Sequence, residues 1–437
     1  MNNLTPVFEC ETGQLILEGP PAGVAGEAPL IPVPGLELAF DRADGRLCRA
    51  VIEAAGEDGS FVVGEQAAAM LIRLFGSEVL GVVSGTGSWK GPQTRVLSSE
   101  PGLTATLSSL ARLDATRATS PVSPDSPWWA AEAAELAERG GLRARARAEA
   151  HQAVIKLFGQ LDTFQTLPTV AIRAAIAVAR IHAVTDPQAA RQLRGAVKKL
   201  AGRTPDGPAP GAGFDVAAEV EGLEKDSARL GGLHWMLDPG LVPEGLFQRG
   251  LSPHSDLSVR HDSANGRVII HALLAPGAAC GAVNRCLARL VDPVVRRVLA
   301  QATFTKAGDC GERSRVTAEL ELPFPLDDVQ DGWIEVVMDK HWPVRSAKGH
   351  RIRRALLWAD TALRAERAPA GLAPHSTPKD WSALATAAWE HCRRDWEAAG
   401  DACHAALAVQ RQTVLDSKPC APQSPADPTC LAEVLGR

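Results

Sequence analysis

The stretch DRADGRL, at residues 41–47, decides the fold expected for this chain, because a near copy, DSANGRV, returns at residues 262–268. Four of the seven residues are identical, and the copies lie 221 positions apart in a chain of 437 residues. Runs rich in strand-forming residues flank both copies. A turn sequence that occurs twice, about half the chain length apart, indicates a repeated structural unit rather than a repeated catalytic site.

Both copies have the residues of a β-hairpin turn. The side chains of Asp41 and Asp262 can accept hydrogen bonds from backbone N–H groups two residues later. Gly45 and Gly266 suit the left-handed backbone that such a turn needs. An Asp-Gly or Asn-Gly pair between extended runs is a strong hairpin signal. We therefore predict that each stretch joins two strands, the first pair covering about residues 36–53.

The segments that follow the two turns suggest the same order of elements. A helix is predicted after each hairpin, at residues 65–75 and 283–300. Residues 315–324 alternate apolar and polar side chains, as a half-buried antiparallel strand does. Residues 331–338 are a plausible partner strand, which predicts a second hairpin in one four-stranded sheet. The matching segment, residues 94–107, has a weaker pattern and predicts a degenerate copy.

Long helical patterns occupy residues 128–201 and 346–412. Asp186 or Thr185 can cap a helix that starts with proline, and such a start is favourable because proline has no N–H to leave unpaired. Thr377 precedes the residues Pro-Lys-Asp, which predicts a variant of the capping box. These signals fix where several helices begin.

The predicted fold class is α+β, with two tandem diverged units, each an antiparallel sheet of hairpins covered on one face by long helices. The predicted segments are a first unit at 1–203 with helices at 128–201, a Pro/Gly-rich linker at 204–214, a second unit at 215–415 with its sheet at about 256–338 and helices at 346–412, and a disordered tail at 416–437. A polar loop is also expected at residues 114–127.

Composition indicates an ordinary globular protein, with 45% hydrophobic and 22% charged residues. The net charge of −5 gives no overall basic surface for nucleic acid. No signal peptide is expected, and apolar runs are too short to cross a membrane. Nine cysteines without CxxC spacing argue against a disulfide framework. A bacterial, cytoplasmic protein is therefore expected.

Histidines are densest between residues 234 and 271. His254 and Asp256 lie two positions apart, and His261 precedes the second turn, so these three residues are weak candidates for a catalytic site. A histidine beside a carboxylate can act as a general base. The first copy has Phe40 where the second has His261, so a site built from both copies is not expected. A structural role within the hairpin is the competing interpretation.

Three tryptophans, Trp381, Trp389 and Trp396, follow one stripe of the last long helical pattern. Such a stripe is typical of a packing seam, and it becomes a candidate partner-binding surface if the rest of the chain leaves it open. Cys392 shares the stripe and is expected to pack as a small apolar residue.

A glycine-rich stretch and two basic clusters are further candidates for binding sites. The glycine-rich stretch at 82–91 has neither of the common phosphate-binding spacings, which favours a plain turn. The basic clusters at 142–151 and 348–354 are expected to be solvated helix faces, although Arg351, Arg353 and Arg354 are candidates for nucleic-acid contacts.

No common catalytic motif is present, and no cofactor or metal site is predicted. The leading hypothesis is a non-catalytic interaction or regulatory protein that binds a protein partner through helical faces. The alternatives are a hydrolase or transferase with the His/Asp site on the second sheet and, more weakly, a nucleic-acid-binding regulator.

Overall fold

The structure is a computed structural model. It describes residues 3–9, 14–53, 64–76, 79, 95–96, 100–164, 167–201, 214–229, 233–276, 278, 280–294, 296–306, 314–322, 326, 329, 332–368, 372–373, 375–417 and 430–435. The chain divides into two compact units. Unit 1 comprises Met1–Thr116, Pro127–Gly207 and Pro425–Leu431, and unit 2 comprises Arg117–Ser126, Pro208–Ser424 and Ala432–Arg437. Of the predicted linker, only Phe214 lies within the described residues.

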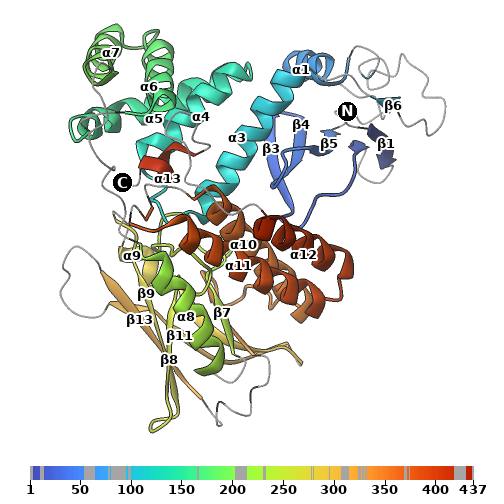
Figure 1. Ribbon diagram of the computed structural model, residues 1–437, viewed down its shortest axis with the longest axis vertical. Coiled ribbons are helices and arrows are strands. Elements are labelled where there is room, and N and C mark those ends of the chain that lie inside the picture. Colours follow the sequence, from blue (N-terminus) through green and yellow to red (C-terminus); the bar gives the residue numbers. More distant parts are fainter. Residues whose placement is uncertain are drawn as a thin grey trace. The chain divides into compact units, whose positions relative to one another are not determined.

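Unit 1 contains a six-stranded antiparallel sheet (Figure 1). Its strands, in order across the sheet, are β3 (Glu27–Val33), β4 (Leu36–Asp41), β5 (Leu47–Glu53), β2 (Gln14–Glu18), β1 (Asn3–Glu9) and β6 (Arg95–Val96). The first predicted hairpin is confirmed as β4–β5. The Asp41 carboxylate accepts hydrogen bonds from the backbone N–H groups of Ala43, at 2.7 Å, and Asp44, at 3.1 Å. Gly45 has a φ of +75°, as the turn requires.

The helices of unit 1 follow their sequence signals closely. They are α1 (Glu65–Phe75), α3 (Pro101–Thr119, whose last three residues belong to unit 2), α4 (Pro127–Arg139), α5 (Arg143–Leu161), α6 (Thr169–His182) and α7 (Pro187–Ala201). Asp186 caps α7, because its carboxylate accepts hydrogen bonds from the N–H groups of Gln188 and Ala189. The predicted helix at 65–75 and the long helical block are confirmed.

The structure corrects the polar loop predicted at 114–127. In the preceding segment, predicted to be a degenerate copy of the hairpin, helix α3 begins at Pro101. Proline suits the first turn of a helix, and the Glu100 carbonyl accepts a hydrogen bond from the N–H of Thr104 at 3.1 Å. Helix α3 continues to Thr119, so the loop predicted at 114–127 is shortened to residues 120–126.

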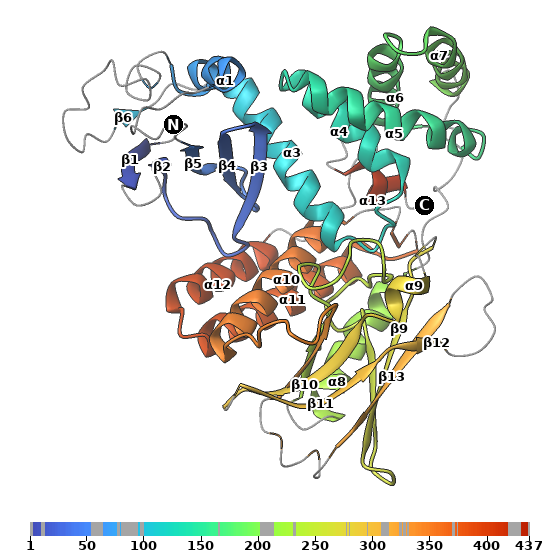
Figure 2. The ribbon, with the colours of Figure 1, turned by 180° about the vertical axis from the view of Figure 1, so that it is seen from behind.

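Unit 2 contains two four-stranded sheets (Figure 2). The first has the order β11 (Arg297–Thr303), β10 (Leu287–Asp292), β14 (Trp333–Val337), β7 (His234–Met236). The second has the order β12 (Thr305–Lys306), β13 (Arg315–Glu321), β9 (Arg267–Leu273), β8 (Ser258–Asp262). The second predicted hairpin is confirmed as β8–β9, where Gly266 has a φ of +62°.

The inward faces of these two sheets form one hydrophobic core. Val268 and Ile270 of β9 and Ile334 and Val336 of β14 belong to the same buried cluster. On the other face of β14, the Trp333 ring stacks on His350 of α10 (Ala347–Arg367) with 4.3 Å between the ring centroids. Strand β14 is therefore covered on both faces, which explains why all five of its residues are buried.

The helix predicted at 283–300 is wrong, because this segment forms the hairpin β10–β11. Pro293 lies at the turn and cannot continue a helix, since it lacks the N–H that an interior helical position needs. Arg289 then faces Glu335 across the β10–β14 pair, and its Nε donates a hydrogen bond to the Glu335 carboxylate at 2.6 Å. The valine-rich sequence on both sides of Pro293 is well suited to strands.

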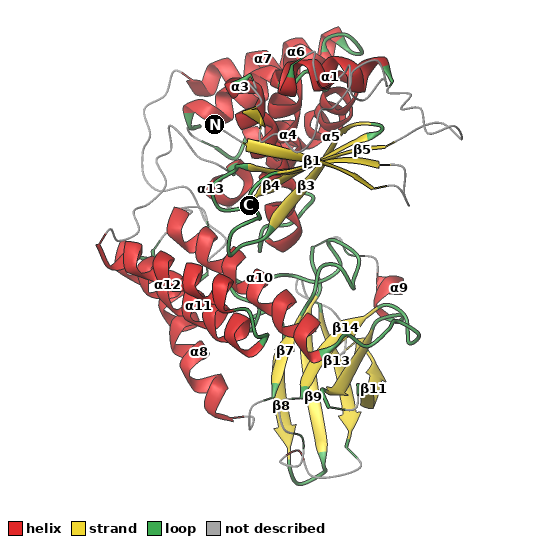
Figure 3. Cartoon of the chain, turned by 90° about the vertical axis from the view of Figure 1, so that its right-hand side faces the viewer, coloured by secondary structure: helices red, strands yellow, loops and turns green. Residues whose placement is uncertain are grey.

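The predicted pairing of residues 315–324 with 331–338 is also wrong. Strand β13 lies between β9 and β12, while β14 lies in the other sheet between β10 and β7. The pair β14–β7 is parallel. The four-stranded sheet of two successive hairpins is thus replaced by two sheets that face each other (Figure 3).

The remaining helices of unit 2 are α8 (Val216–Arg229), α9 (Cys280–Val283), α10, α11 (Pro378–Ala398), α12 (Ala402–Ser417) and α13 (Leu431–Leu435, whose first residue belongs to unit 1). Thr377 and Asp380 form the predicted capping box at the start of α11. Helix α13 lies within the predicted disordered tail at 416–437, where a short final turn is also expected, and Glu433 in this helix is fully buried. Residues 418–429 lie outside the described residues.

The fold is therefore mixed α+β with sheets that are mainly antiparallel, and the internal duplication is not confirmed. Both hairpins turn at an Asx-Gly corner, but β4–β5 lies within a six-stranded sheet whereas β8 is the edge of a four-stranded one. The segments that follow the two hairpins also differ. Helix α1 follows β4–β5, whereas strands β10 and β11 occupy the matching segment after β8–β9.

We expect Gly45→Ala to destabilise the protein more than Gly266→Ala. Both positions have positive φ, which costs alanine about 1–2 kcal/mol. A Cβ on Gly45 would also lie 2.5 Å from Oγ of Ser108, whereas a Cβ on Gly266 would meet nothing within 4 Å. The collision adds about 1–3 kcal/mol. Urea unfolding of both variants measures the difference in the free energy of unfolding. The double variant Gly45→Ala/Ser108→Gly removes the collision and should recover part of the lost stability. Equal losses in the two single variants, or no recovery in the double variant, would contradict the expectation.

Candidate functional site

The structure does not bring the three candidate catalytic residues together. The His254 ring lies edge-on to Trp235, with 4.8 Å between centroids, and 6.0 Å from the ring of His391. Burial, together with the neighbouring His391 and Arg354, lowers the pKa of His254 to about 3. A neutral imidazole among aromatic rings is not oriented by a carboxylate, as a general base would be.

Asp256 lies in a different environment from His254. Its carboxylate accepts hydrogen bonds from Nη1 of Arg249 at 2.6 Å and from the Gly250 backbone N–H at 2.8 Å. Burial raises the pKa of Asp256 to about 6, against the effect of Arg249. The cavity beside it, lined also by Asp360 and Arg364, has a volume of about 20 Å³. That is space for one water molecule.

His261 is on β8, opposite Val268 of β9. Because cross-strand partners share a face, His261 lies on the core side of the sheet, one residue pair from the turn of the hairpin. His271 is opposite Thr317 and forms a 2.9 Å hydrogen bond with its hydroxyl group on the outer face. The histidines of this region are therefore divided between two faces of one sheet.

The proposed tryptophan surface is corrected by the structure. Trp381, Trp389 and Trp396 are 2%, 0% and 5% exposed, so the chain itself covers them. Nε1 of Trp389 donates a hydrogen bond to Glu366 of α10 at 2.7 Å, and the Trp396 ring stacks on His404 of α12. The stripe is the core seam of three packed helices and offers no surface to a partner.

The basic residues of α10 are engaged within unit 2. Arg354 forms a two-pronged hydrogen-bonded ion pair with Asp395. Arg353 donates to Asp238 at 3.0 Å, and Arg351 donates to the carbonyl oxygen of Ala398 at 2.7 Å. In the other basic cluster, Arg145 pairs with Asp114 and Glu149. The candidate nucleic-acid residues are thus held by internal partners.

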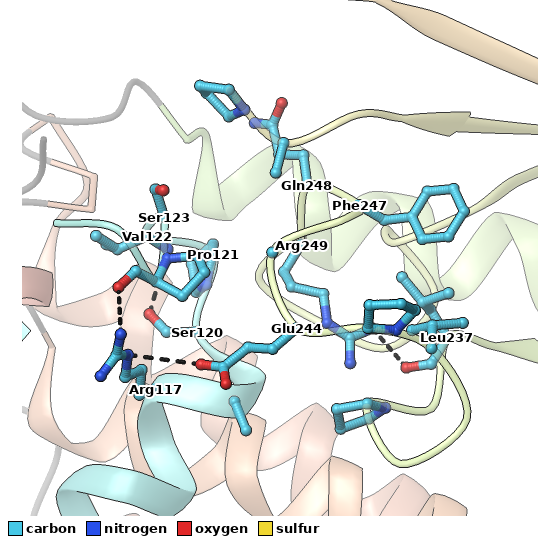
Figure 4. Close-up of a pocket in the computed structure, with 18 residues that line it drawn as sticks. Arg117, Ser120, Pro121, Val122, Ser123, Leu237, Glu244, Phe247, Gln248 and Arg249 are labelled. Atoms are coloured by element: carbon cyan, nitrogen blue, oxygen red, sulfur yellow. Dashed lines mark hydrogen bonds and ion pairs between the residues drawn. The ribbon is translucent and has the colours of Figure 1, made fainter. Parts of the chain in front are cut away.

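Among the described residues, a groove in unit 2 is a candidate binding site (Figure 4). Its first hollow has a volume of about 170 Å³ and is lined mainly by apolar side chains. A second hollow of about 360 Å³ shares part of its wall, so the two are adjacent. The shared residues are Arg117, Pro124, Pro243, Glu244 and Gly245. We call this site the two-hollow groove.

Prolines give the groove its shape. The lining of the two hollows includes Pro121, Pro124, Pro239, Pro243 and Pro276. Proline has a fixed φ and no N–H, so these segments present a rigid apolar wall without unpaired donors. A wall that is already ordered lowers the entropy cost of binding.

An ion pair of the groove lies where its two hollows meet. Nε of Arg117 and the Glu244 carboxylate are 3.5 Å apart, and Arg117 also donates to the Pro124 carbonyl at 2.9 Å. Gly245 has a φ of +74°, and a Cβ there would lie 3.0 Å from Cγ of Pro124. The two loop segments that contain Pro124 and Gly245 can therefore approach closely because residue 245 is glycine.

Sequence reasoning missed this groove. Its two walls are about 120 positions apart in the chain, at residues 117–124 and 237–249. The available signal was the density of proline in SPVSPDSP and in DPGLVPEG, which predicts loops but not their association. The predicted polar loop contributes one wall.

Within the described ranges, no three His, Cys, Asp or Glu side chains are arranged to hold a metal ion. Of the helices in those ranges, none combines the length and the apolar character that a membrane span requires. The glycine-rich stretch at 82–91 lies outside them. No family model matches the chain, and neither a curated protein nor a solved structure is significantly similar to it.

Proposed function

We propose that this protein is a non-catalytic interaction protein that binds an extended, apolar segment of a partner protein in the two-hollow groove. The observation that carries the proposal is the pair of adjacent hollows with one shared wall. In an extended peptide, alternate side chains point the same way about 6–7 Å apart, so two of them can enter two neighbouring hollows. A compact small molecule would use only one.

The polar residues between the hollows suit a peptide backbone. The Arg117 and Glu244 side chains are 28% and 54% exposed, so each keeps hydrogen-bonding capacity toward a ligand. Arg117 can donate to a partner carbonyl, and the Glu244 carboxylate can accept from a partner N–H. Main-chain hydrogen bonds of this kind supply affinity, while the first hollow, with its mainly apolar lining, supplies selectivity for an apolar side chain.

The experiment is a selection of peptides from a displayed random library on the full chain, followed by affinity measurement of the enriched peptide. Val242→Glu, which places a charge in the first hollow, is expected to weaken binding about 10- to 100-fold, since burying an apolar side chain is worth about 1.5–3 kcal/mol. The matched control is Val294→Glu, because Val294 is 86% exposed in unit 2 and lies outside the groove.

Circular dichroism must show that both variants keep the wild-type fold. Equal affinity of the selected peptide for wild type and Val242→Glu would refute the groove as the site. Enrichment of peptides without bulky apolar residues would refute the proposed partner chemistry.

The other hypotheses have less support. A hydrolase or transferase would need His254, Asp256 and His261 to act on one substrate, and their side chains have separate surroundings. A nucleic-acid-binding regulator would need Arg351, Arg353 and Arg354 to leave their internal partners. A bacterial, cytoplasmic location and descent of the two hairpins from one module remain part of the proposal, the latter supported by the shared Asx-Gly corner.

A further inference from the structure

Four histidines of unit 2 gather around one buried arginine. We call them the imidazole cluster: His234 at the start of β7, His254 in the loop before β8, His350 on α10 and His391 on α11. Arg354 on α10 is a charged neighbour of all four. Trp358 stacks on His391 at 4.4 Å and lies 5.3 Å from the His254 ring, so aromatic packing fixes these imidazoles.

Arg354 has hydrogen-bonding capacity that its ion pair does not use. Its Nε and Nη2 both donate to the Asp395 carboxylate. Nη1 is buried and has no hydrogen-bond partner in the part of the chain that the structure describes. The same is true of Nδ1 of His254 and of both ring nitrogens of His350. Buried polar atoms without partners are uncommon and point to a group not supplied by the chain.

The charges around the cluster favour an anion. Each imidazole has a lowered pKa, to about 3 for His234 and His254 and about 4 for His391, first because of burial and then through nearby positive groups. The neighbouring cations are Arg345, Arg351, Arg354 and Arg394.

The neighbouring carboxylates are already paired. Asp238 binds Arg345 and Arg353, Asp395 binds Arg354, and Glu390 binds Arg393 and Arg394. None of these acids is hydrogen-bonded to an imidazole of the cluster in the described residues. The unused capacity of the cluster is therefore one N–H donor of Arg354 and the ring nitrogens of neutral imidazoles, each of which has one N–H and becomes a double donor when it takes up a proton.

The cluster is partly exposed to solvent. His234, His254 and His391 are half-buried, whereas His350 and Arg354 are buried. Arg394, beside His391, is 61% exposed. The positive charge of Arg394 is therefore exposed to solvent, while the donor of Arg354 is buried.

We propose that the imidazole cluster and Arg354 form a binding site for a tetrahedral oxyanion of the phosphate class. The oxyanion accepts a hydrogen bond from Nη1 of Arg354 and further hydrogen bonds from the imidazole N–H groups. Arginine suits such a ligand because its guanidinium group stays charged and donates in a fixed geometry. A divalent cation is disfavoured at the same place by the charge of Arg354. This site is separate from the two-hollow groove and does not depend on its function.

Binding is coupled to protonation. A bound dianion offsets the charge of Arg354 and stabilises an imidazolium beside it, so the site takes up protons when it fills. For each proton taken up, affinity is expected to rise about tenfold per unit of falling pH. Sulfate is the appropriate probe for this effect because, unlike phosphate, it does not titrate between pH 6 and pH 8.

The test is isothermal titration calorimetry of the full chain with inorganic phosphate and with sulfate, against sodium chloride at matched ionic strength. Both oxyanions are expected to bind, and sulfate at least tenfold more tightly at pH 6 than at pH 8. Glycerol 3-phosphate tests whether an ester of phosphate binds more tightly than the free anion.

Two variants locate the site. His391→Phe and His254→Phe keep a flat ring for stacking and remove the N–H, and each is expected to weaken sulfate binding at least tenfold. His341→Phe is the matched control, because His341 is exposed and lies in a loop of the same unit. Melting curves show whether each variant folds.

The proposal is overturned if phosphate and sulfate give no heat beyond that of chloride. It is also overturned if the three variants bind equally well, because the anion would then lie elsewhere. If both cluster variants fail to fold, Arg394→Gln supplies the test, since an affinity unchanged by removal of the exposed charge would contradict the proposed site.

Discussion

Glu433→Gln is expected to lower the free energy of unfolding by about 3–5 kcal/mol, because it leaves buried charge without a partner. The Glu433 carboxylate accepts hydrogen bonds from Nε of Arg364 at 2.8 Å, from Nη2 of Arg367 at 2.9 Å and from the Ser120 hydroxyl at 2.9 Å. Arg364 is only 4% exposed, so water cannot replace the lost acceptor.

The pKa of Glu433 supports this expectation. Burial alone would raise it, but Arg367 and Arg364 hold it below the ordinary value. The carboxylate is therefore charged at neutral pH, and the amide of glutamine cannot compensate two arginines. Glu433→Leu in a chain that also carries Arg364→Met should recover part of the loss, because it replaces a buried pair with apolar side chains.

The measurement is urea unfolding, with Glu321→Gln as the control. Glu321 pairs with Arg267 at 3.3 Å but is 80% exposed, and such surface pairs contribute about 0–1 kcal/mol. A loss in Glu433→Gln no larger than in Glu321→Gln would show that the buried network does not stabilise the fold.

Acid is expected to destabilise the protein well above the pH at which most carboxylates titrate. In the unfolded chain the histidines bind protons near pH 6.5, whereas in the folded chain His234 and His254 do so only near pH 3 and His391 near pH 4. Between these values the unfolded state binds more protons, so stability is present above pH 6.5 and is lost as the pH falls. His350, with its pKa also lowered by burial, acts in the same direction.

The expected net loss from pH 7 to pH 5 is about 3 kcal/mol, after allowance for partial solvent access and opposing groups. Asp256 opposes it, because burial raises its pKa to about 6 and the folded state then gains protons as the pH falls. Asp395 acts in the same sense as Asp256, since burial raises its pKa as well. The loss is a large part of the total stability of a typical domain.

Urea unfolding at pH 7, 6 and 5, in buffers without phosphate or sulfate, measures this effect. Removing two of the four imidazoles of the cluster in His254→Phe/His391→Phe should lower the loss between pH 7 and pH 5 by roughly half, to about 1.5 kcal/mol. The control is His341→Phe, which should keep the wild-type slope. Equal stability of wild type at pH 7 and pH 5 would contradict the prediction.

Local signals in the sequence predicted the local structure well. The turns at Gly45 and Gly266, the cap at Asp186 and the capping box at Thr377 all formed as expected, because each depends on residues within a few positions of one another. The helix predicted at 283–300 is wrong because it was inferred from the position of the segment after the second turn. Pro293, which disfavours a helix interior, was the better local signal there.

The candidate site could not be predicted in this way. The stripe of Trp381, Trp389 and Trp396 has the same pattern whether it faces a partner or helices of its own chain, and only the packing of α10 and α12 against α11 distinguishes the two. His254 and Asp256 are neighbours in sequence, yet their side chains enter different environments.

The sequence by itself determined where this chain turns and where several of its helices begin, because backbone geometry and capping depend on adjacent residues. The tertiary structure alone decided which strands pair, which loops meet at the two-hollow groove and which histidines surround Arg354. These choices depend on burial of apolar surface between segments far apart in the chain, and such burial has no preferred spacing along the sequence.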